Sequence, residues 1–189
     1  MDIGAKCSIL AGGKSSRMGT DKAFMKLGDL TVMEFMIDKM SDIFDEIQII
    51  ADDTEKFRYF NLDLHEDIFQ NFGPLGGIHS ALLNSEEENN FIISVDLPLI
   101  PVELPEYLYT QLGKEPVVVP TDNGKLQPLC GYYSKKYLPF LEGCLIRAGK
   151  KDSPSVVRFL EYVGYSKVEV SEMGFYQPEI FMNMNTPDD

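Results

Sequence analysis

The sequence predicts an α/β fold: a single doubly wound, mostly parallel sheet with helices on both faces, formed by one domain of residues 1–189. Two observations predict it. Apolar segments of strand length alternate along the chain with segments whose apolar residues recur at helical spacing. Several strand-like segments end in short turns rich in glycine, proline or aspartate. The length of 189 residues is close to that of one typical domain.

The first strand is expected over residues 5–10, an apolar run that stops at two adjacent glycines. A helix is expected over 32–40, because its apolar residues share one helical face and Thr31 is a suitable N-cap. An isoleucine-rich strand follows at 46–51. The same patterns then predict a short helix over 53–60, a strand over 62–65, a helix over 73–85, a strand over 91–95, a helix over 103–112 and a strand over 117–119.

Beyond about residue 120 the alternation loosens. The remaining elements are expected in this order: strand 126–133, helix 135–143, helix 154–162, strand 167–170 and a short apolar strand 180–182. The second of these helices has Ser153 as its expected N-cap and Pro154 at its first position, where a missing N–H does no harm.

Charge and composition exclude several classes of protein. The net charge is −13, and residues 41–115 alone contain 16 acidic and 3 basic side chains. Such a field repels polyanions, so a nucleic-acid partner is not expected. No apolar run approaches about 18 residues, so no membrane span is expected. The N-terminus does not resemble a signal peptide and the three cysteines show no paired spacing, which favours a cytoplasmic protein.

The loop after the first strand carries the first candidate site. Gly12 and Gly13 allow close approach of the backbone to a ligand, and consecutive N–H groups there can bind an anion. Arg17 and Lys22 add positive charge. The loop is not a P-loop, since Ser8 stands where that motif needs glycine, and it is not a GxGxxG dinucleotide motif. Phosphate binding and a purely structural turn both remain open on this evidence alone.

Asp96 is the second candidate, because it ends a buried apolar strand where an unpaired carboxylate would be costly. Its partner could be a cation, a helix N-terminus or a metal ion. If the first loop holds a triphosphate, Mg²⁺ bridging the phosphates to Asp96 is favoured, since Mg²⁺ takes only one or two protein carboxylates and otherwise binds water and phosphate oxygens.

Five motifs together resemble a known family. They are residues 10–22 (LAGGKSSRMGTDK), 73–77 (GPLGG), 95–98 (VDLP), 128–131 (PLCG) and 183–188 (NMNTPD). In this order they resemble the molybdenum cofactor guanylyltransferase (MobA) family, whose fold is Rossmann-like, of the nucleotide-diphospho-sugar transferase type. The resemblance implies a nucleotide-binding half over about 1–120 and a pterin-binding half over about 121–189. The implied reaction transfers GMP from GTP to Mo-molybdopterin with Mg²⁺ and releases diphosphate.

The resemblance also implies the site residues. The residues implied for the GTP site are Leu10, Ala11, Gly12, Gly13, Lys22, Asp67 and Asp96. Arg17, Lys22 and Asp96 would serve catalysis, with Asp96 also the metal ligand. Asn183 and Asn185 would face the pterin. The chain departs from the family at Ile50, where an asparagine can occur, and Asp52 is a possible substitute.

The basic turn at 147–151 has two interpretations. Arg147 and Lys150 could dock the phosphate of the second substrate, or the turn could simply be solvated. No acid–base role is expected for His65 or His79, because the attacking phosphate is already anionic at neutral pH.

GTP and Mo-molybdopterin are the expected substrates, and molybdoenzymes or cofactor-insertion proteins are possible partners. The alternatives are a cytidylyltransferase for the same cofactor, a sugar-phosphate nucleotidyltransferase, and a non-catalytic cofactor carrier.

Overall fold

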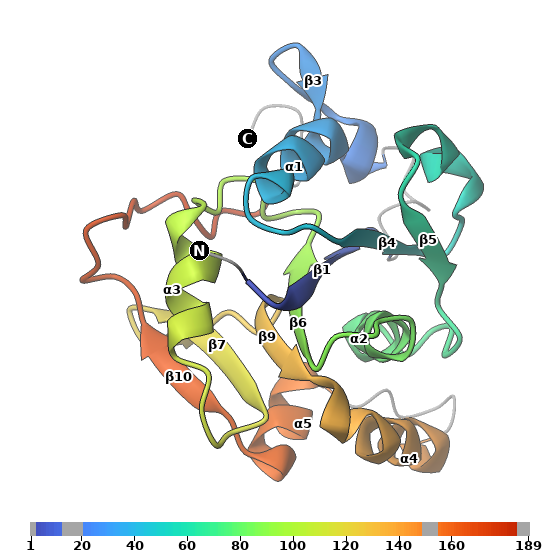
Figure 1. Ribbon diagram of the computed structural model, residues 1–189, viewed down its shortest axis with the longest axis vertical. Coiled ribbons are helices and arrows are strands. Elements are labelled where there is room, and N and C mark those ends of the chain that lie inside the picture. Colours follow the sequence, from blue (N-terminus) through green and yellow to red (C-terminus); the bar gives the residue numbers. More distant parts are fainter. Residues whose placement is uncertain (1–2, 13–20, 149–154, 185–189) are drawn as a thin grey trace.

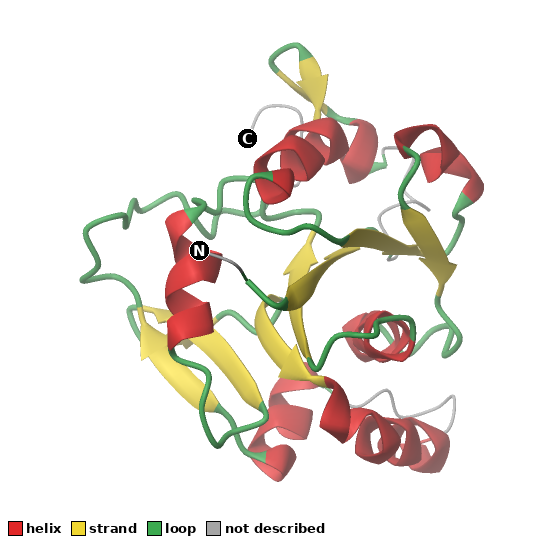
Figure 2. Ribbon diagram, in the orientation of Figure 1, coloured by secondary structure: helices red, strands yellow, loops and turns green. Residues whose placement is uncertain are grey.

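The computed structural model describes residues 3–12, 21–148 and 155–184. One sheet forms the centre of the molecule, with strand order β10-β7-β9-β6-β1-β4-β5 and β8 paired to β7. Helices α1 and α3 cover one face of the sheet, and α2, α4 and α5 cover the other (Figures 1 and 2). The predicted fold class is confirmed.

The strands of this sheet are β1 (Ala5–Leu10), β4 (Ile47–Ala51), β5 (Asp63–Glu66), β6 (Asn89–Ser94), β7 (Val117–Asp122), β8 (Lys125–Leu126), β9 (Cys130–Ser134) and β10 (Ser166–Glu169). A separate hairpin consists of β2 (Lys26–Leu27) and β3 (Leu30–Thr31). The helices are α1 (Val32–Ser41), α2 (Pro74–Leu83), α3 (Glu103–Thr110), α4 (Leu138–Ala148) and α5 (Val156–Val163), with short 3₁₀ turns η2 (Lys22–Phe24), η3 (Glu55–Phe60) and η4 (Lys135–Tyr137).

Strand β1 is central and buried along its whole length. It pairs in parallel with β4 on one side and with β6 on the other. A strand covered on both faces reads as a continuous apolar run, which is why its bounds follow directly from the sequence. Strand β9 is antiparallel to both β6 and β7. Because β5 also pairs in parallel with β4, and β10 with β7, the sheet is mostly parallel.

Two apolar layers hold the helices to the sheet. The layer under α1 and α3 contains Met33, Met36 and Leu104, all at most 1% exposed. The other layer contains Leu75 of α2 and Leu141 of α4, both fully buried. Within the described ranges, no helix combines the length and the apolar character needed to span a membrane.

The start of α1 confirms the N-cap predicted from the sequence. The Thr31 hydroxyl accepts a hydrogen bond from the Glu34 N–H at 3.2 Å. The Glu34 carboxylate accepts one from the Thr31 N–H at 2.6 Å. This reciprocal capping box satisfies N–H groups that have no partner inside the helix.

The strand predicted over 126–133 is wrong as a single element. It is interrupted between β8 and β9, where the Cys130 N–H bonds the Gln127 carbonyl at 3.2 Å. Pro128 lies inside this turn and has no N–H to offer the sheet.

Two predictions near the C-terminus are also wrong. Helix α5 begins at Val156, and its N-cap is Ser155, whose hydroxyl accepts from the Arg158 N–H at 3.2 Å. The predicted cap Ser153 and the predicted first residue Pro154 lie outside the described residues. The strand predicted over 180–182 is a turn, closed by a bond from the Ile180 N–H to the Gln177 carbonyl. Ile180 and Phe181 are buried by local turns against the core rather than by pairing with a strand, whereas Met182 is exposed.

The chain order creates a switch point beside β1. From β1 the chain proceeds outward to β4 and β5, then returns through α2 to β6 on the opposite side of β1. The carboxyl ends of these four strands lie at one edge of the sheet, called here the carboxyl edge. Ligands of open α/β sheets bind outside this edge at the switch point.

Candidate functional site

The chain that leaves β1 is held between the ends of its two neighbours. The Leu10 carbonyl accepts a hydrogen bond from the Val95 N–H at 3.0 Å. The Ala11 N–H donates to the Ile50 carbonyl at 2.8 Å. Leu10, Ala11 and Gly12, all predicted site residues, therefore lie at the centre of the carboxyl edge with a fixed backbone.

Gly12 faces an acidic side chain from the end of β4. A Cβ atom placed on Gly12 would lie 3.6 Å from Asp52 Oδ1. Ile50, where the chain departs from the family pattern, is 1% exposed and packs in the layer under α2. Its side chain therefore serves the core, and the polar group beside the glycine is that of Asp52.

The first turn of α2 packs closely against this region. A Cβ on Gly76 would lie 2.6 Å from the Phe69 carbonyl oxygen, so that position accepts only glycine. A Cβ on Gly77 would lie 3.3 Å from the Leu10 side chain. The two glycines let the helix N-terminus approach both β1 and the loop after β5, which places its N–H groups and positive dipole end beside the site.

Asp67 lies on that loop, and its carboxyl group is directed at α2. Asp67 Oδ2 lies 3.6 Å from the position of a Cβ on Gly76, and Oδ1 lies 3.7 Å from that on Gly77. Oδ1 is buried without a hydrogen-bond partner among the described residues. Burial, together with the charge of Asp52, raises the pKa of Asp67 to about 6. A hydrogen-bond donor supplied by a ligand would satisfy this oxygen.

A cavity of about 280 Å³ lies along the same loop. It is lined by residues 68–72, directly after Asp67. The rings of Phe69 and Phe72 meet edge to face there, with centroids 5.7 Å apart.

Lys22 and Asp96 meet at the end of β6. Lys22 Nζ lies 3.7 Å from Asp96 Oδ2, and the two side chains are 18% and 26% exposed. Lys22 begins η2, whose N-cap Asp21 accepts from the Ala23 N–H at 3.3 Å. Asp21 is in turn bonded by Lys56 Nζ at 2.9 Å. Of the partners considered for Asp96 from sequence, a cation is present, at a distance longer than a hydrogen bond.

The residues around Asp96 fit a magnesium ion held largely by a ligand. The described residues contain no group of three or more histidine, cysteine, aspartate or glutamate side chains that could enclose a metal. Asp96 offers one partly exposed carboxylate, a hard oxygen donor. Mg²⁺ commonly binds one or two carboxylates together with substrate phosphates and water, and this single carboxylate suffices for that mode.

The C-terminal segment also reaches Asp96. The Met184 N–H donates to the Asp96 carbonyl at 3.0 Å, and Met184 is 5% exposed. Asn183, a predicted pterin residue, is exposed immediately before it. Sequence reasoning missed this contact, because no local pattern links a chain terminus to a distant turn.

Of the remaining predicted site residues only Arg147 is described, and the structure does not place it at this pair. Arg147 lies on the last turn of α4, with its guanidinium 3.6 Å from Cys144 Sγ on the same helix. Four predicted site residues lie outside the described residues: Gly13, Arg17, Lys150 and Asn185.

Two thiols and one imidazole are buried inside the fold. Cys7 and Cys130 are fully buried, which raises their thiol pKa values far above the ordinary range. His79 is 1% exposed, and its pKa is lowered by burial, so the ring is neutral at pH 7. Its ring packs against that of Phe69, with centroids 4.7 Å apart.

Comparisons with known proteins show which family the chain resembles. Residues 7–162 match the family model of the MobA-like NTP transferase domain. A "probable molybdenum cofactor guanylyltransferase" of Carboxydothermus hydrogenoformans is 35% identical, and the match covers 96% of this chain and 91% of the relative. A relative of the same name from Aquifex aeolicus is 37% identical over 97% of this chain and 87% of its own.

Solved structures show the same fold. The crystal structure of molybdopterin-guanine dinucleotide biosynthesis protein A from Archaeoglobus fulgidus has a TM-score of 0.79 at 22% identity, covering 97% of this chain and 93% of its own. A crystal structure from Aquifex aeolicus has a TM-score of 0.75 at 32% identity, covering 96% of this chain and 93% of its own.

Proposed function

This chain belongs to the MobA-like NTP transferase family and is a nucleotidyltransferase; we propose that it transfers GMP from GTP to Mo-molybdopterin and releases diphosphate in a Mg²⁺-dependent reaction. The observation that carries the proposal is the Lys22–Asp96 pair at the carboxyl edge, 3.7 Å apart beside the switch point of the sheet. It provides an ammonium for phosphate and a carboxylate for a divalent cation at one place.

The chemistry requires positive charge and alignment rather than a general base. The attacking terminal phosphate of the pterin is already anionic, so no proton has to be removed from it. Lys22 would bind the phosphates of the nucleotide and stabilise charge that develops on the departing diphosphate. Asp96 would hold Mg²⁺, which supplies electrostatic stabilisation of the phosphoryl oxygens when bound. Arg17 is proposed to add a further cation.

Recognition of the nucleotide is proposed for the groups around Gly12. The fixed backbone of Leu10, Ala11 and Gly12, with Gly13, would line the nucleotide. Asp67 would accept hydrogen bonds from guanine or from ribose hydroxyls. Its buried Oδ1, which has no hydrogen-bond partner among the described residues, supports that role. Guanine offers two adjacent N–H donors to such an acceptor, whereas cytosine and adenine do not. A base that leaves buried polar groups of the site without hydrogen bonds binds much more weakly, so the site discriminates strongly against it.

The second substrate is proposed to bind toward the C-terminal half, over about 121–189. Asn183 and Asn185 would contact the pterin, and Arg147 with Lys150 would dock its phosphate. Support comes from the contact of Met184 with Asp96, which brings the segment containing Asn183 to the proposed metal ligand. A cytoplasmic location and delivery of the product to molybdoenzymes or insertion proteins complete the proposal.

The test compares nucleotides before it uses the unstable pterin. Thermal stabilisation is measured with millimolar GTP, CTP, ATP and UTP, with and without Mg²⁺, since a ligand that binds only the folded state raises its stability. Stabilisation by GTP with Mg²⁺, lost in Asp96→Ala and kept in the exposed control Asp38→Ala, followed by diphosphate release with Mo-molybdopterin, is the expected result. A preference for CTP would instead support a cytidylyltransferase. No response to any nucleotide would contradict the proposal and favour a carrier.

A further inference from the structure

The turn that follows Asp96 is held by a lysine from another element. Residues 97–100 form no helix or strand, and Leu97, Pro98 and Ile100 are buried. Lys39 Nζ, from α1, donates to the Pro98 carbonyl at 2.9 Å and to the Ile100 carbonyl at 3.1 Å. Carbonyl groups in a buried irregular segment need donors from elsewhere, and one ammonium serves two of them here.

The ammonium of Lys39 gives up part of its hydration to make these two hydrogen bonds. The side chain is half-buried, and its Nζ also lies 4.5 Å from the centre of the Phe35 ring. Burial lowers the pKa of Lys39, while the charge of Glu103 on α3 acts in the opposite direction. An ammonium that loses water and gains carbonyl ligands in this way is fixed in position.

Lys39 is not part of the apolar face that packs α1 against the sheet. The helix is anchored to the sheet by Val32, Met33, Met36 and Met40, each at most 1% exposed. The two hydrogen bonds of Lys39 go instead to the turn after Asp96.

The backbone around Asp96 is fixed on both sides of this turn as well. The Leu97 N–H donates to the Ser94 carbonyl at 3.1 Å, which closes the turn at the end of β6. The Met184 N–H donates to the Asp96 carbonyl at 3.0 Å. Lys39 holds the backbone that follows Leu97, through the carbonyls of Pro98 and Ile100.

We propose that Lys39 is a positioning residue of the site: by holding the carbonyls of Pro98 and Ile100, it fixes the direction in which the Asp96 carboxylate faces Lys22 and a divalent cation. The inference rests on the proposed function, and it adds a residue that touches neither substrate nor metal. Groups that orient a metal ligand without binding the metal commonly change metal affinity by about 10–100-fold when removed.

The experiment uses two substitutions and a matched control on the same helix. Lys39→Met keeps the aliphatic stem and removes the ammonium, whereas Lys39→Arg keeps donors for the carbonyls. Thr31→Ala removes the α1 cap and destabilises the helix without touching the turn. Binding of Mn²⁺ in the presence of GTP is followed by electron paramagnetic resonance, and hydrogen exchange is followed at the Leu97 amide.

We expect Lys39→Met to raise the Mn²⁺ dissociation constant about tenfold or more and to speed exchange at Leu97. Lys39→Arg should keep most of the wild-type Mn²⁺ affinity and of the slow exchange at Leu97. Thr31→Ala should leave both properties near wild type. Equal weakening by Lys39→Met and Thr31→Ala would reduce the effect to helix stability and overturn the inference. Unchanged exchange at Leu97 in Lys39→Met would overturn it whatever the nucleotide result. Failure of the wild-type protein to bind Mn²⁺ with GTP would count against the proposed function itself.

Discussion

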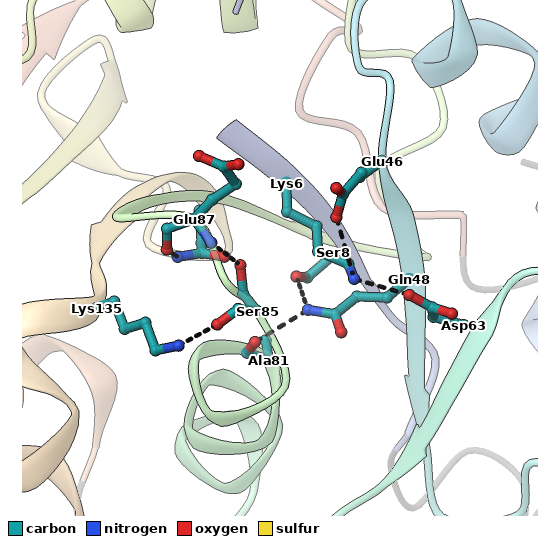
Figure 3. Close-up of polar contacts among 10 residues, drawn as sticks. Lys6, Ser8, Glu46, Gln48, Asp63, Ala81, Ser85, Glu87 and Lys135 are labelled. Carbon is teal, nitrogen blue, oxygen red and sulfur yellow. Dashed lines mark hydrogen bonds and ion pairs between the residues drawn. The ribbon is translucent and has the colours of Figure 1, made fainter. Parts of the chain in front are cut away.

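The two edges of the central sheet use polar side chains in opposite ways. At the edge where β1, β4, β5 and β6 begin, called here the amino edge, polar groups bond to one another (Figure 3). Lys6 Nζ lies 2.8 Å from Asp63 and 3.4 Å from Glu46. The Gln48 amide donates to the Ser8 hydroxyl and to the Ala81 carbonyl, at 2.8 and 2.9 Å. Lys135 bonds the Ser85 carbonyl just past the end of α2.

At the carboxyl edge two acidic groups, Asp67 and Asp96, are short of partners among the described residues. Asp67 Oδ1 has none among the described residues, and Asp96 meets Lys22 only at 3.7 Å. At the amino edge, Gln48 Oε1 and Asn90 Oδ1 likewise have no hydrogen-bond partner among the described residues. Both residues, however, are 0% exposed and uncharged.

This contrast separates the polar groups that stabilise the fold from those available to a ligand. Polar groups sealed inside a protein contribute specificity to the fold, whereas partly exposed charges without good partners are typical of binding sites. Substitutions at the two edges should therefore separate activity from stability.

The largest effect is expected at the carboxyl edge, from Asp96→Asn. The amide cannot supply the negative oxygen that the proposed Mg²⁺ needs, so kcat/KM should fall by about 10³-fold or more. The free energy of unfolding should change by less than about 1 kcal/mol, because the side chain is partly exposed and weakly paired. Diphosphate release and urea unfolding measure the two quantities. Activity within about tenfold of wild type would remove Asp96 from the metal site.

The reverse pattern is expected at the amino edge, from Gln48→Ala. Gln48 is fully buried and donates two hydrogen bonds. Truncation removes both and leaves a cavity, so the free energy of unfolding should fall by about 2–3 kcal/mol. The activity of the folded fraction should stay within about twofold of wild type, because the residue is remote from the chemistry. A loss of activity at full folding would show that the two edges are coupled.

The sequence predicts the elements whose burial is decided locally. Strand β1 has the predicted bounds because both of its faces are covered, and α1 has its predicted cap because capping is a local hydrogen bond. The break between β8 and β9 and the turn over 180–182 depend on contacts with distant segments, and apolar runs do not encode these.

The site shows the same division. Lys22 and Asp96 are predictable as site residues because each follows a strand that ends at the carboxyl edge, and topology brings the two loops together. Lys39 is not predictable, because a lysine on an amphipathic helix has the same sequence signature whether its ammonium meets water or two carbonyls. The raised pKa of Asp67 likewise depends on the packing of its loop and on the approach of Asp52.

A smaller effect is expected from Asp67→Asn. This substitution should raise the free energy of unfolding, whereas most substitutions lower it. The folded-state pKa of Asp67 is about 6, against an ordinary value of 3.8. The folded state therefore favours the protonated form, and wild-type stability falls as pH rises from about 4 through 6. Asparagine carries no such charge, so the variant should be about 1–2 kcal/mol more stable at pH 7.5, given that the carboxyl keeps part of its hydration.

Urea unfolding of the wild type and of Asp67→Asn at several pH values tests this difference in stability. The advantage of Asp67→Asn should shrink as pH falls below the folded-state pKa of about 6 and disappear near about pH 3, where both states of the wild type are largely protonated. The variant should also bind GTP less tightly, because the amide replaces one of the carboxylate oxygens proposed to accept hydrogen bonds from guanine or ribose. A pH-independent difference would show that the raised pKa is not the cause.

The smallest effect is expected from the same type of substitution, aspartate to asparagine, at the amino edge. Here it should lower the free energy of unfolding. Lys6, bonded to Asp63 at 2.8 Å, lowers the pKa of that carboxyl below its ordinary value of 3.8. The charged form is thus favoured in the folded state, and this contribution is present at neutral pH and lost as pH falls through the folded-state pKa. Because Asp63 is 64% exposed, Asp63→Asn should lower the free energy of unfolding at pH 7.5 by only about 0.5 kcal/mol. One aspartate-to-asparagine change should therefore stabilise the carboxyl edge and the other weaken the amino edge, and equal signs at the two positions would contradict the division of roles between them.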